Sequence, residues 1–96
     1  MDKRIKIHEN VSNYVEKLFF EYNATINILK YLTAQDNTKL EYIEKYFKIA
    51  EEKYIELELA KKEISEQYRP QNMFVQRYSF DFDNCEIVYA GGECND

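Results

Sequence analysis

Hydrophobic residues recur every three or four positions between Asn10 and Thr33, the spacing that places them on one face of an α-helix. Asn10 and Ser12 are both residue types that cap the start of a helix. The pattern predicts a first helix over residues 10–33. Its apolar stripe consists of Val11, Val15, Leu18, Tyr22, Leu29 and Leu32, widened by Phe19 and Ile26.

The helical spacing resumes after the connector that ends at Thr38. The stretch Thr38-Lys-Leu-Glu41 matches a capping box, in which the threonine hydroxyl accepts an amide hydrogen and the glutamate reaches back. Pro70 disfavours helical geometry in the residue before it, so the helix should end at Arg69. A second helix is therefore predicted over residues 38–69. Its stripe consists of Ile43, Phe47, Ala50, Tyr54, Leu57, Ile64 and Tyr68.

The period changes to two in the last quarter of the chain, which predicts a β-hairpin over residues 73–90 with a two-residue turn at Asp83-Asn84. This register puts apolar pairs on one face and mostly polar pairs, such as Asp81 with Glu86, on the other. A shift of one residue would mix the two faces. The apolar pairs are Phe82 with Cys85, Phe80 with Ile87, and Tyr78 with Tyr89. Residues 1–9 are expected to form an N-terminal arm and residues 91–96 a flexible tail.

A short connector makes consecutive long helices antiparallel neighbours, so the fold class is mainly α: a two-helix hairpin followed by a short C-terminal β-hairpin, in one domain. Several apolar residues lie off the two stripes, and one neighbouring helix cannot cover them. We expect both the C-terminal segment and a second copy to cover them, which predicts a homodimer with a four-helix bundle. These residues are Phe20, Ile28, Tyr31, Ile49, Ile55 and Leu59.

Charge and composition exclude several classes of protein. The formal net charge of −5 argues against nucleic-acid binding, which relies on a basic face. No apolar run approaches the roughly 20 residues that span a membrane. The first ten residues, MDKRIKIHEN, lack the apolar core of a signal peptide, so we expect a cytoplasmic protein whose Cys85 and Cys94 stay as thiols.

Catalytic and metal-binding motifs are not found in the sequence. His8 is the sole histidine, no Glu-x-x-His motif occurs, and there is no Gly-rich phosphate loop, Cys-x-x-Cys pair or Ser/His/Asp set. We therefore predict no enzymatic activity, no metal and no cofactor. Asp81, Asp83 and Glu86 gather at the predicted hairpin tip, where they either attract a cation or basic partner, or simply protect an exposed strand edge from aggregation.

The function that we predict is non-catalytic protein–protein interaction, as in an adaptor, an inhibitor or an immunity-type factor. The chain has nine tyrosines, and tyrosine combines a large ring with a polar tip that suits binding surfaces. The sequence does not identify the protein partner. The residues expected to bind it through the helical surface are Tyr14, Phe20, Tyr31, Tyr42 and Tyr54.

The C-terminal sequence YAGGECND supports an alternative function. Gly91 and Gly92 are the chain's two glycines, and Cys94 follows them closely. Glycines give a segment the freedom to enter an enzyme's cleft. The chain would then be a ribosomally made peptide substrate, with Gly91, Gly92 and Cys94 in the modified segment and the helices as carrier or leader. In the simpler interpretation, the two glycines merely end the strand.

Overall fold

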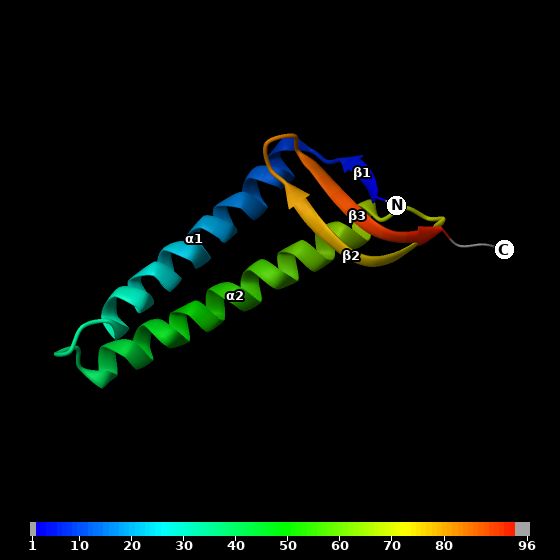
Figure 1. Cartoon of the computed structure of the whole chain (residues 1–96). Coiled ribbons are helices and arrows are strands. Elements are labelled where there is room, and N and C mark those ends of the chain that lie inside the picture. Colours follow the sequence, from blue (N-terminus) through cyan, green and yellow to red (C-terminus); the bar gives the residue numbers. More distant parts are fainter. Residues whose placement is uncertain (1, 94–96) are drawn as a thin grey trace.

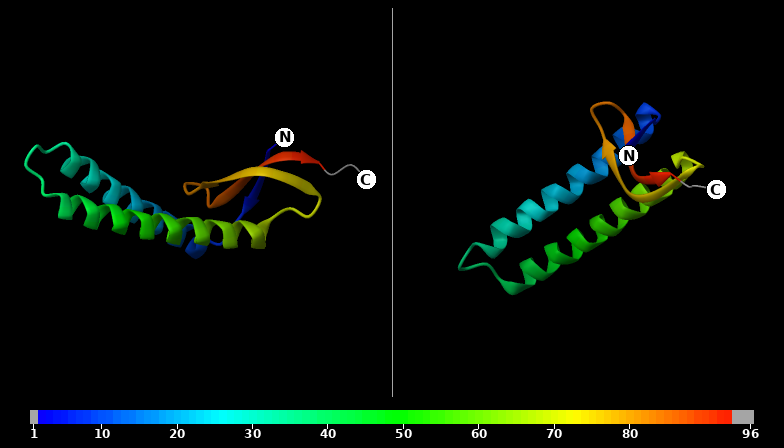
Figure 2. Two further views of the ribbon diagram at one scale, coloured as in Figure 1. Left: turned by 90° about the horizontal axis from the view of Figure 1, so that it is seen from below. Right: turned by 45° about the vertical axis from the view of Figure 1, so that its right-hand side comes forward.

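The structure, a computed structural model, describes residues 2–93 and contains two helices and three strands. The helices form an antiparallel hairpin, and the strands form an antiparallel sheet that lies across one face of the hairpin at one end (Figures 1 and 2). This confirms the helical hairpin and the C-terminal β-hairpin. In chain order the elements are β1 (Asp2–Lys6), α1 (Glu9–Thr33), α2 (Leu40–Tyr68), β2 (Met73–Asp81) and β3 (Glu86–Glu93).

Both helices start differently from the prediction. The cap of α1 is His8, whose Nδ1 accepts the amide hydrogen of Asn10 over 3.1 Å, in place of the predicted Asn10 or Ser12. The predicted capping box of α2 is wrong: the N-cap is Lys39, and no side chain caps this end. The helix begins at Leu40, so Glu41 is only the second helical residue and cannot act as the third residue of a box. The end of α2 just before Arg69-Pro70 is confirmed.

The register of the β-hairpin is confirmed, although its turn is longer than predicted. The residues 82–85 form a four-residue turn, so Phe82 and Cys85 do not pair. Within this turn, Cys85 adopts the left-handed conformation, with φ of 52°. The predicted pairs that the structure contains are Phe80 with Ile87, Tyr78 with Tyr89, Asp81 with Glu86, Ser79 with Val88, and Arg77 with Ala90.

The N-terminal segment predicted as an arm is instead a third strand. β1 pairs antiparallel with β3, with Ile5 opposite Ile87, and the strand order is β1-β3-β2. The central strand is therefore β3, and both β1 and β2 are edges. The alternation in this segment is weak in sequence because Lys3, Arg4 and Lys6 dominate it, although Ile7 is buried.

The two glycines lie within β3, so the prediction of a flexible tail from residue 91 is wrong for residues 91–93. Gly91 lies opposite Val75, and Gly92 lies opposite Phe74, next to a bulge in β2 between Val75 and Arg77. A Cβ on Gly91 would lie 1.9 Å from the carbonyl oxygen of Phe74, so the chains approach too closely there for any side chain. Residues 94–96, with Cys94, lie outside the described residues.

The core lies where the sheet covers the helices. One cluster of buried residues centres on Ile87 and Tyr89 in the sheet, and a second joins Val15 and Leu18 of α1 to Leu57 of α2. Ile64 and Phe80 pack against both clusters and connect them. The Tyr89 hydroxyl donates a 2.6 Å hydrogen bond to the Ser65 carbonyl, which ties the central strand to the last turns of α2.

The other end of the helical hairpin extends beyond the sheet as a two-helix rod (Figure 1). The chain measures 60 × 27 × 18 Å, and its radius of gyration is 17.2 Å. A compact chain of this length would have a radius of gyration of about 12.5 Å. Between residues 19 and 56 only Thr25 and Ala50 are buried. The expectation that the C-terminal segment covers the off-stripe apolar residues is wrong, because Phe20, Ile28 and four others stay exposed or half-buried.

Candidate protein-interaction surfaces

The five aromatic residues predicted to bind a partner are all exposed, with between 49% and 66% of each surface accessible. They do not form one patch. A helix turns by about 100° per residue, so Tyr14 and Phe20 lie about 120° apart around α1, as do Tyr42 and Tyr54 around α2. Tyr54 contacts the ring of Tyr22 across the hairpin, at 5.7 Å between centroids. The five aromatic residues therefore lie on more than one face of the helical hairpin.

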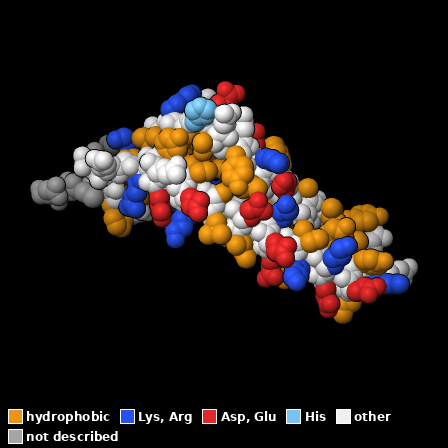
Figure 3. Space-filling model, turned by 180° about the vertical axis from the view of Figure 1, so that it is seen from behind, with side chains coloured by type: hydrophobic (Ala, Val, Ile, Leu, Met, Phe, Trp, Pro, Cys, Tyr) orange, Lys and Arg blue, Asp and Glu red, His pale blue; other side chains and the backbone are white. Residues whose placement is uncertain are grey.

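Apolar side chains also line shallow hollows between the two helices. Tyr14 of α1 and Leu59 of α2 line a hollow of about 490 Å³, floored by Val11, Ala60 and Ile64. From behind, apolar side chains alternate with charged ones along the whole length of the hairpin (Figure 3).

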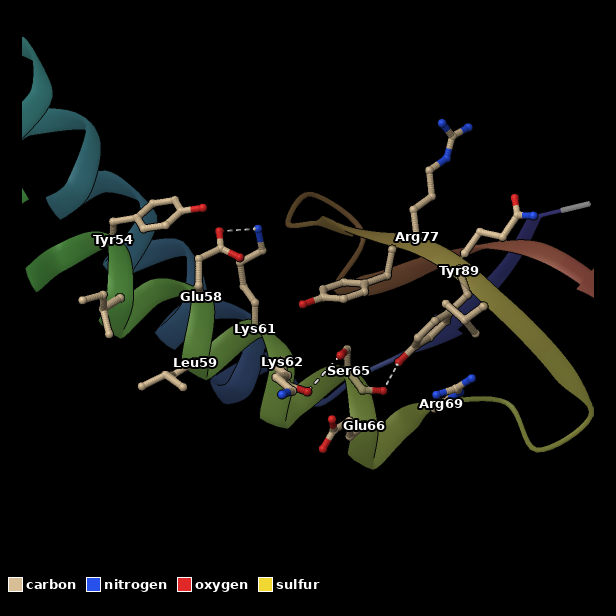
Figure 4. A pocket seen from close by; sticks show the side chains of 14 residues that line it. Tyr54, Glu58, Leu59, Lys61, Lys62, Ser65, Glu66, Arg69, Arg77 and Tyr89 are labelled. Carbon is tan, nitrogen blue, oxygen red and sulfur yellow. Dashed lines mark hydrogen bonds and ion pairs between the residues drawn. The ribbon is translucent and has the colours of Figure 1, made fainter. Parts of the chain in front are cut away.

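A groove lies between the C-terminal half of α2 and strand β2 (Figure 4). Its volume is about 740 Å³. We call it the α2–β2 groove. Helix α2 contributes the exposed Tyr54, Ile55 and Leu59, and β2 contributes residues 75–78. Sequence reasoning identified Ile55 and Leu59 as apolar residues without cover, but it gave no signal that β2 would lie beside them.

Positive charge gathers in the α2–β2 groove, although the whole chain carries −5. Four cationic and two acidic side chains line it, a net charge of +2. One pair is satisfied locally, since Lys61 contacts Glu58 at 3.3 Å. Within residues 2–93, neither Lys62, Arg69 nor Arg77 forms an ion pair. The groove is therefore suited to a ligand with negative charge. The six charged residues are Glu58, Lys61, Lys62, Glu66, Arg69 and Arg77.

Tyr89 forms the inner wall of the α2–β2 groove (Figure 4). Burial raises its pKa to about 12, the nearby Tyr78 adds to the rise, and Arg69 opposes it. The hydroxyl therefore stays protonated at neutral pH and remains a donor to the Ser65 carbonyl. A tyrosine with this pKa cannot serve as a general base at neutral pH, so its role is structural.

The acidic hairpin tip is compensated within the chain. Arg4 of β1 donates hydrogen bonds to Asp81 Oδ2 at 2.9 Å and to Glu86 Oε1 at 3.1 Å. The Asn84 side chain donates to Asp81 at 2.8 Å and, ahead of Arg4, holds the pKa of that carboxyl below its usual value. The cation predicted to be attracted to this tip is therefore Arg4 itself, which removes the need for an external ion or a basic partner there.

The remaining candidates for chemistry occupy structural positions. His8 caps α1, and Cys85 lies half-buried in the turn of the β-hairpin with Sγ 3.9 Å from the Phe82 carbonyl. No group of three or more potential metal ligands occurs within residues 2–93. Neither described helix is both long and apolar enough to cross a membrane.

Comparisons with protein-family models, with curated proteins and with solved structures find no match to this chain.

Proposed function

We propose that this chain is a non-catalytic protein-interaction module, which acts in the cytoplasm and pairs with a second copy through its helical hairpin to form a four-helix bundle. The observation that carries the proposal is the excess of apolar surface on the part of the hairpin that the sheet leaves bare. Twelve large hydrophobic side chains are at least 41% exposed, and eleven of them lie on the two helices.

Single exposed hydrophobic residues are ordinary on protein surfaces. Here they follow one another along the rod, where Thr25 and Ala50 alone are buried. The interactions that join the two helices along the rod include the Tyr22–Tyr54 ring contact and an ion pair between Lys53 and Glu21 at 3.5 Å. Two helices that touch only along a narrow seam usually need a third element against them. A covering partner therefore explains why the sequence keeps these side chains apolar.

The dimensions of the hairpin fit a second copy of itself. The 25 residues of α1 span about 38 Å. With a diameter of about 10 Å per helix, one face of the pair offers roughly 750 Å². A stable interface buries about 800 Å² per partner. Two hairpins of equal length packed face to face give the common four-helix arrangement.

Exposed aromatic residues that the second copy does not cover remain for another protein, as an adaptor, inhibitor or immunity-type factor requires. Because Tyr14 and Phe20 lie about 120° apart around α1, as do Tyr42 and Tyr54 around α2, one flat dimer face cannot bury all of them. The peptide-substrate alternative stays a prediction, and no feature of the described residues favours it. Intact mass of the protein from its native host tests it, since modification would change that mass.

The oligomeric state tests the proposal. Analytical ultracentrifugation at micromolar concentrations should give twice the 11.6 kDa chain mass. The double variant Ile28→Glu/Tyr42→Glu should sediment as a monomer, because it places charges on the bare rod. The double variant Lys30→Glu/Lys48→Glu changes exposed residues of the same helices that are already charged, and it should stay dimeric. A monomeric wild-type chain, or a dimer that the apolar substitutions leave intact, would overturn the proposal.

A further inference from the structure

Strand β2 has a free edge. β2 pairs with β3 on one side, and among residues 2–93 no strand pairs with its other side. With nine residues, β2 is the longest strand of the sheet. An unpaired edge presents a row of backbone donors and acceptors to any extended chain that approaches it.

The α2–β2 groove runs along this edge, so the space that a fourth strand would occupy already exists. Side chains of a strand alternate between its two faces. One face of an added strand would therefore lie over Ile55 and Leu59 of α2, which are 56% and 55% exposed. The other face would share the outer side of the sheet with Arg77, which points away from α2 (Figure 4).

The charges of the α2–β2 groove determine which side chains an added strand should carry. Arg77 has no ion-pair partner within residues 2–93, and neither has Lys62 beside Leu59. Opposite charges on neighbouring strands stabilise a sheet, and like charges destabilise it. Acidic side chains on the outward face of an added strand would pair with Arg77. Acidic side chains near the two ends of that strand would lie near Lys62 and Arg69.

A second copy of β2 does not fit the edge equally well. Arg77 is the central residue of β2, which runs from Met73 to Asp81. Full antiparallel pairing of two copies about a twofold axis would place Arg77 directly opposite Arg77 of the other copy. The same cations that favour an acidic peptide therefore disfavour edge-to-edge pairing of two copies.

We infer that the α2–β2 groove is a binding site for an extended peptide that alternates acidic and apolar residues and adds to the edge of β2 as a fourth strand. This inference rests on the proposed interaction function and assigns one of its surfaces, which adjoins the bare rod at Tyr54 and Ile55, to a partner of defined chemistry.

A synthetic peptide tests the site. The probe is a labelled, end-capped peptide of roughly eight residues that alternates Glu and Val, long enough to follow most of the strand. We expect saturable binding by fluorescence anisotropy, weakened by added salt, with amide NMR shifts centred on residues 75–78. A peptide that alternates Lys and Val should bind at least about tenfold more weakly. N-methylation of alternate backbone nitrogens that face β2 should abolish binding, because a strand adds through main-chain hydrogen bonds.

Charge reversal in the groove supplies the matched protein variants. Arg77→Glu/Lys62→Glu should weaken binding of the Glu/Val peptide by about tenfold, the effect of losing two partly exposed charge pairs. Lys30→Glu/Lys48→Glu carries the same change of net charge outside the groove and should bind like the wild type. Equal loss in both variants would show that only net charge matters, and it would overturn the site.

Other results overturn the inference as well: no saturable binding, equal binding of the Lys/Val peptide, or binding that N-methylation leaves unchanged. Without peptide, Arg77→Glu/Lys62→Glu should leave the oligomeric state unchanged in analytical ultracentrifugation. If the substitution turns a dimer into a monomer, a second copy occupies the groove and the inference is again wrong. The two proposals fail separately. A dimer that does not bind the peptide contradicts the groove assignment, whereas a monomer that binds it contradicts the four-helix bundle.

Discussion

The two ends of the helical hairpin share the same apolar periodicity but have different surroundings. Both ends carry apolar residues at helical spacing, yet ten of the twelve buried residues lie at the end that the sheet covers. At the bare end, residues of the same stripes remain open to solvent: Phe47 is 56% exposed and Tyr54 is 49% exposed.

The difference shows that apolar periodicity makes a helix amphipathic but does not make a core. At the covered end, side chains of α1, α2 and the sheet meet. Ile64 and Phe80 join the two clusters of buried residues there. At the bare end, Thr25 and Ala50 are the only buried residues between positions 19 and 56, and the helices meet along one seam that includes the Tyr22–Tyr54 ring contact. The stability of the isolated chain should therefore reside in the covered end, and the bare end should be the part that depends on a partner.

The largest expected effect is a cavity in the covered end. Ile87 is fully buried in the central strand, and Ile87→Ala should lower the free energy of unfolding by about 2–5 kcal/mol, as for other buried aliphatic truncations. Leu40, at the bare end, is 67% exposed. Leu40→Ala should change the free energy of unfolding by less than about 0.5 kcal/mol. Urea denaturation of both variants makes the measurement. Equal losses would break the comparison, because Leu40 would then be as closely packed as Ile87.

A smaller loss is expected at the first glycine of β3. Gly91→Ala would place a methyl group against the Phe74 carbonyl and force the backbone of β2 and β3 apart, at a cost of about 1–3 kcal/mol. Gly92→Ala is the matched control, because a Cβ there meets nothing within 4 Å. Thermal unfolding of the pair measures the difference. If both variants unfold alike, the close approach at Gly91 does not hold the sheet together.

These glycines also show where sequence reasoning stops. The hairpin register was predictable because a shift of one residue would have mixed apolar and polar faces around Phe80 and Ile87. Gly91 looked like the end of a strand, since the contact that requires it comes from Phe74, distant in sequence. Strand β1 was missed because its cations hide the alternation, and Arg4 finds its acidic partners only in the folded chain.

The same limit applies to the candidate site. Phe20 and Tyr31 followed from counting apolar residues beyond one seam, and their exposure agrees with that count. The α2–β2 groove did not follow, because it depends on which strand lies at the edge of the sheet. That order was set by the unpredicted pairing of β1 with β3, which left β2 at the edge.

The hydrogen bond from Tyr89 to the Ser65 carbonyl joins β3 to α2 within the covered end. The pH dependence of stability tests this bond. Tyr89→Phe removes the hydrogen bond to Ser65 and should cost about 1 kcal/mol. The folded state favours the neutral hydroxyl, since its pKa rises from 10.0 to about 12. This contribution is therefore complete below pH 10 and is lost as pH rises toward 12. Unfolding free energies measured across that range should show the loss in the wild type and not in Tyr89→Phe. If Tyr89 ionised over the same pH range as the exposed tyrosines, the raised pKa assigned to its hydroxyl would be wrong.

The smallest expected effect concerns the bare end alone. Helix α2 starts at the N-cap Lys39 without a side-chain cap. Lys39→Asp would supply a carboxylate that accepts hydrogen bonds from the backbone N–H groups of the first turn. Its negative charge would also interact favourably with the positive end of the helix dipole. It should stabilise this end by about 0.5 kcal/mol. Amide hydrogen exchange should slow in the first turns of α2 and stay unchanged in β3, while Lys39→Ala, which adds no acceptor, should leave both unchanged. Equal slowing in β3 would mean that the two ends unfold as one cooperative unit, and the bare end would then not be independently weak.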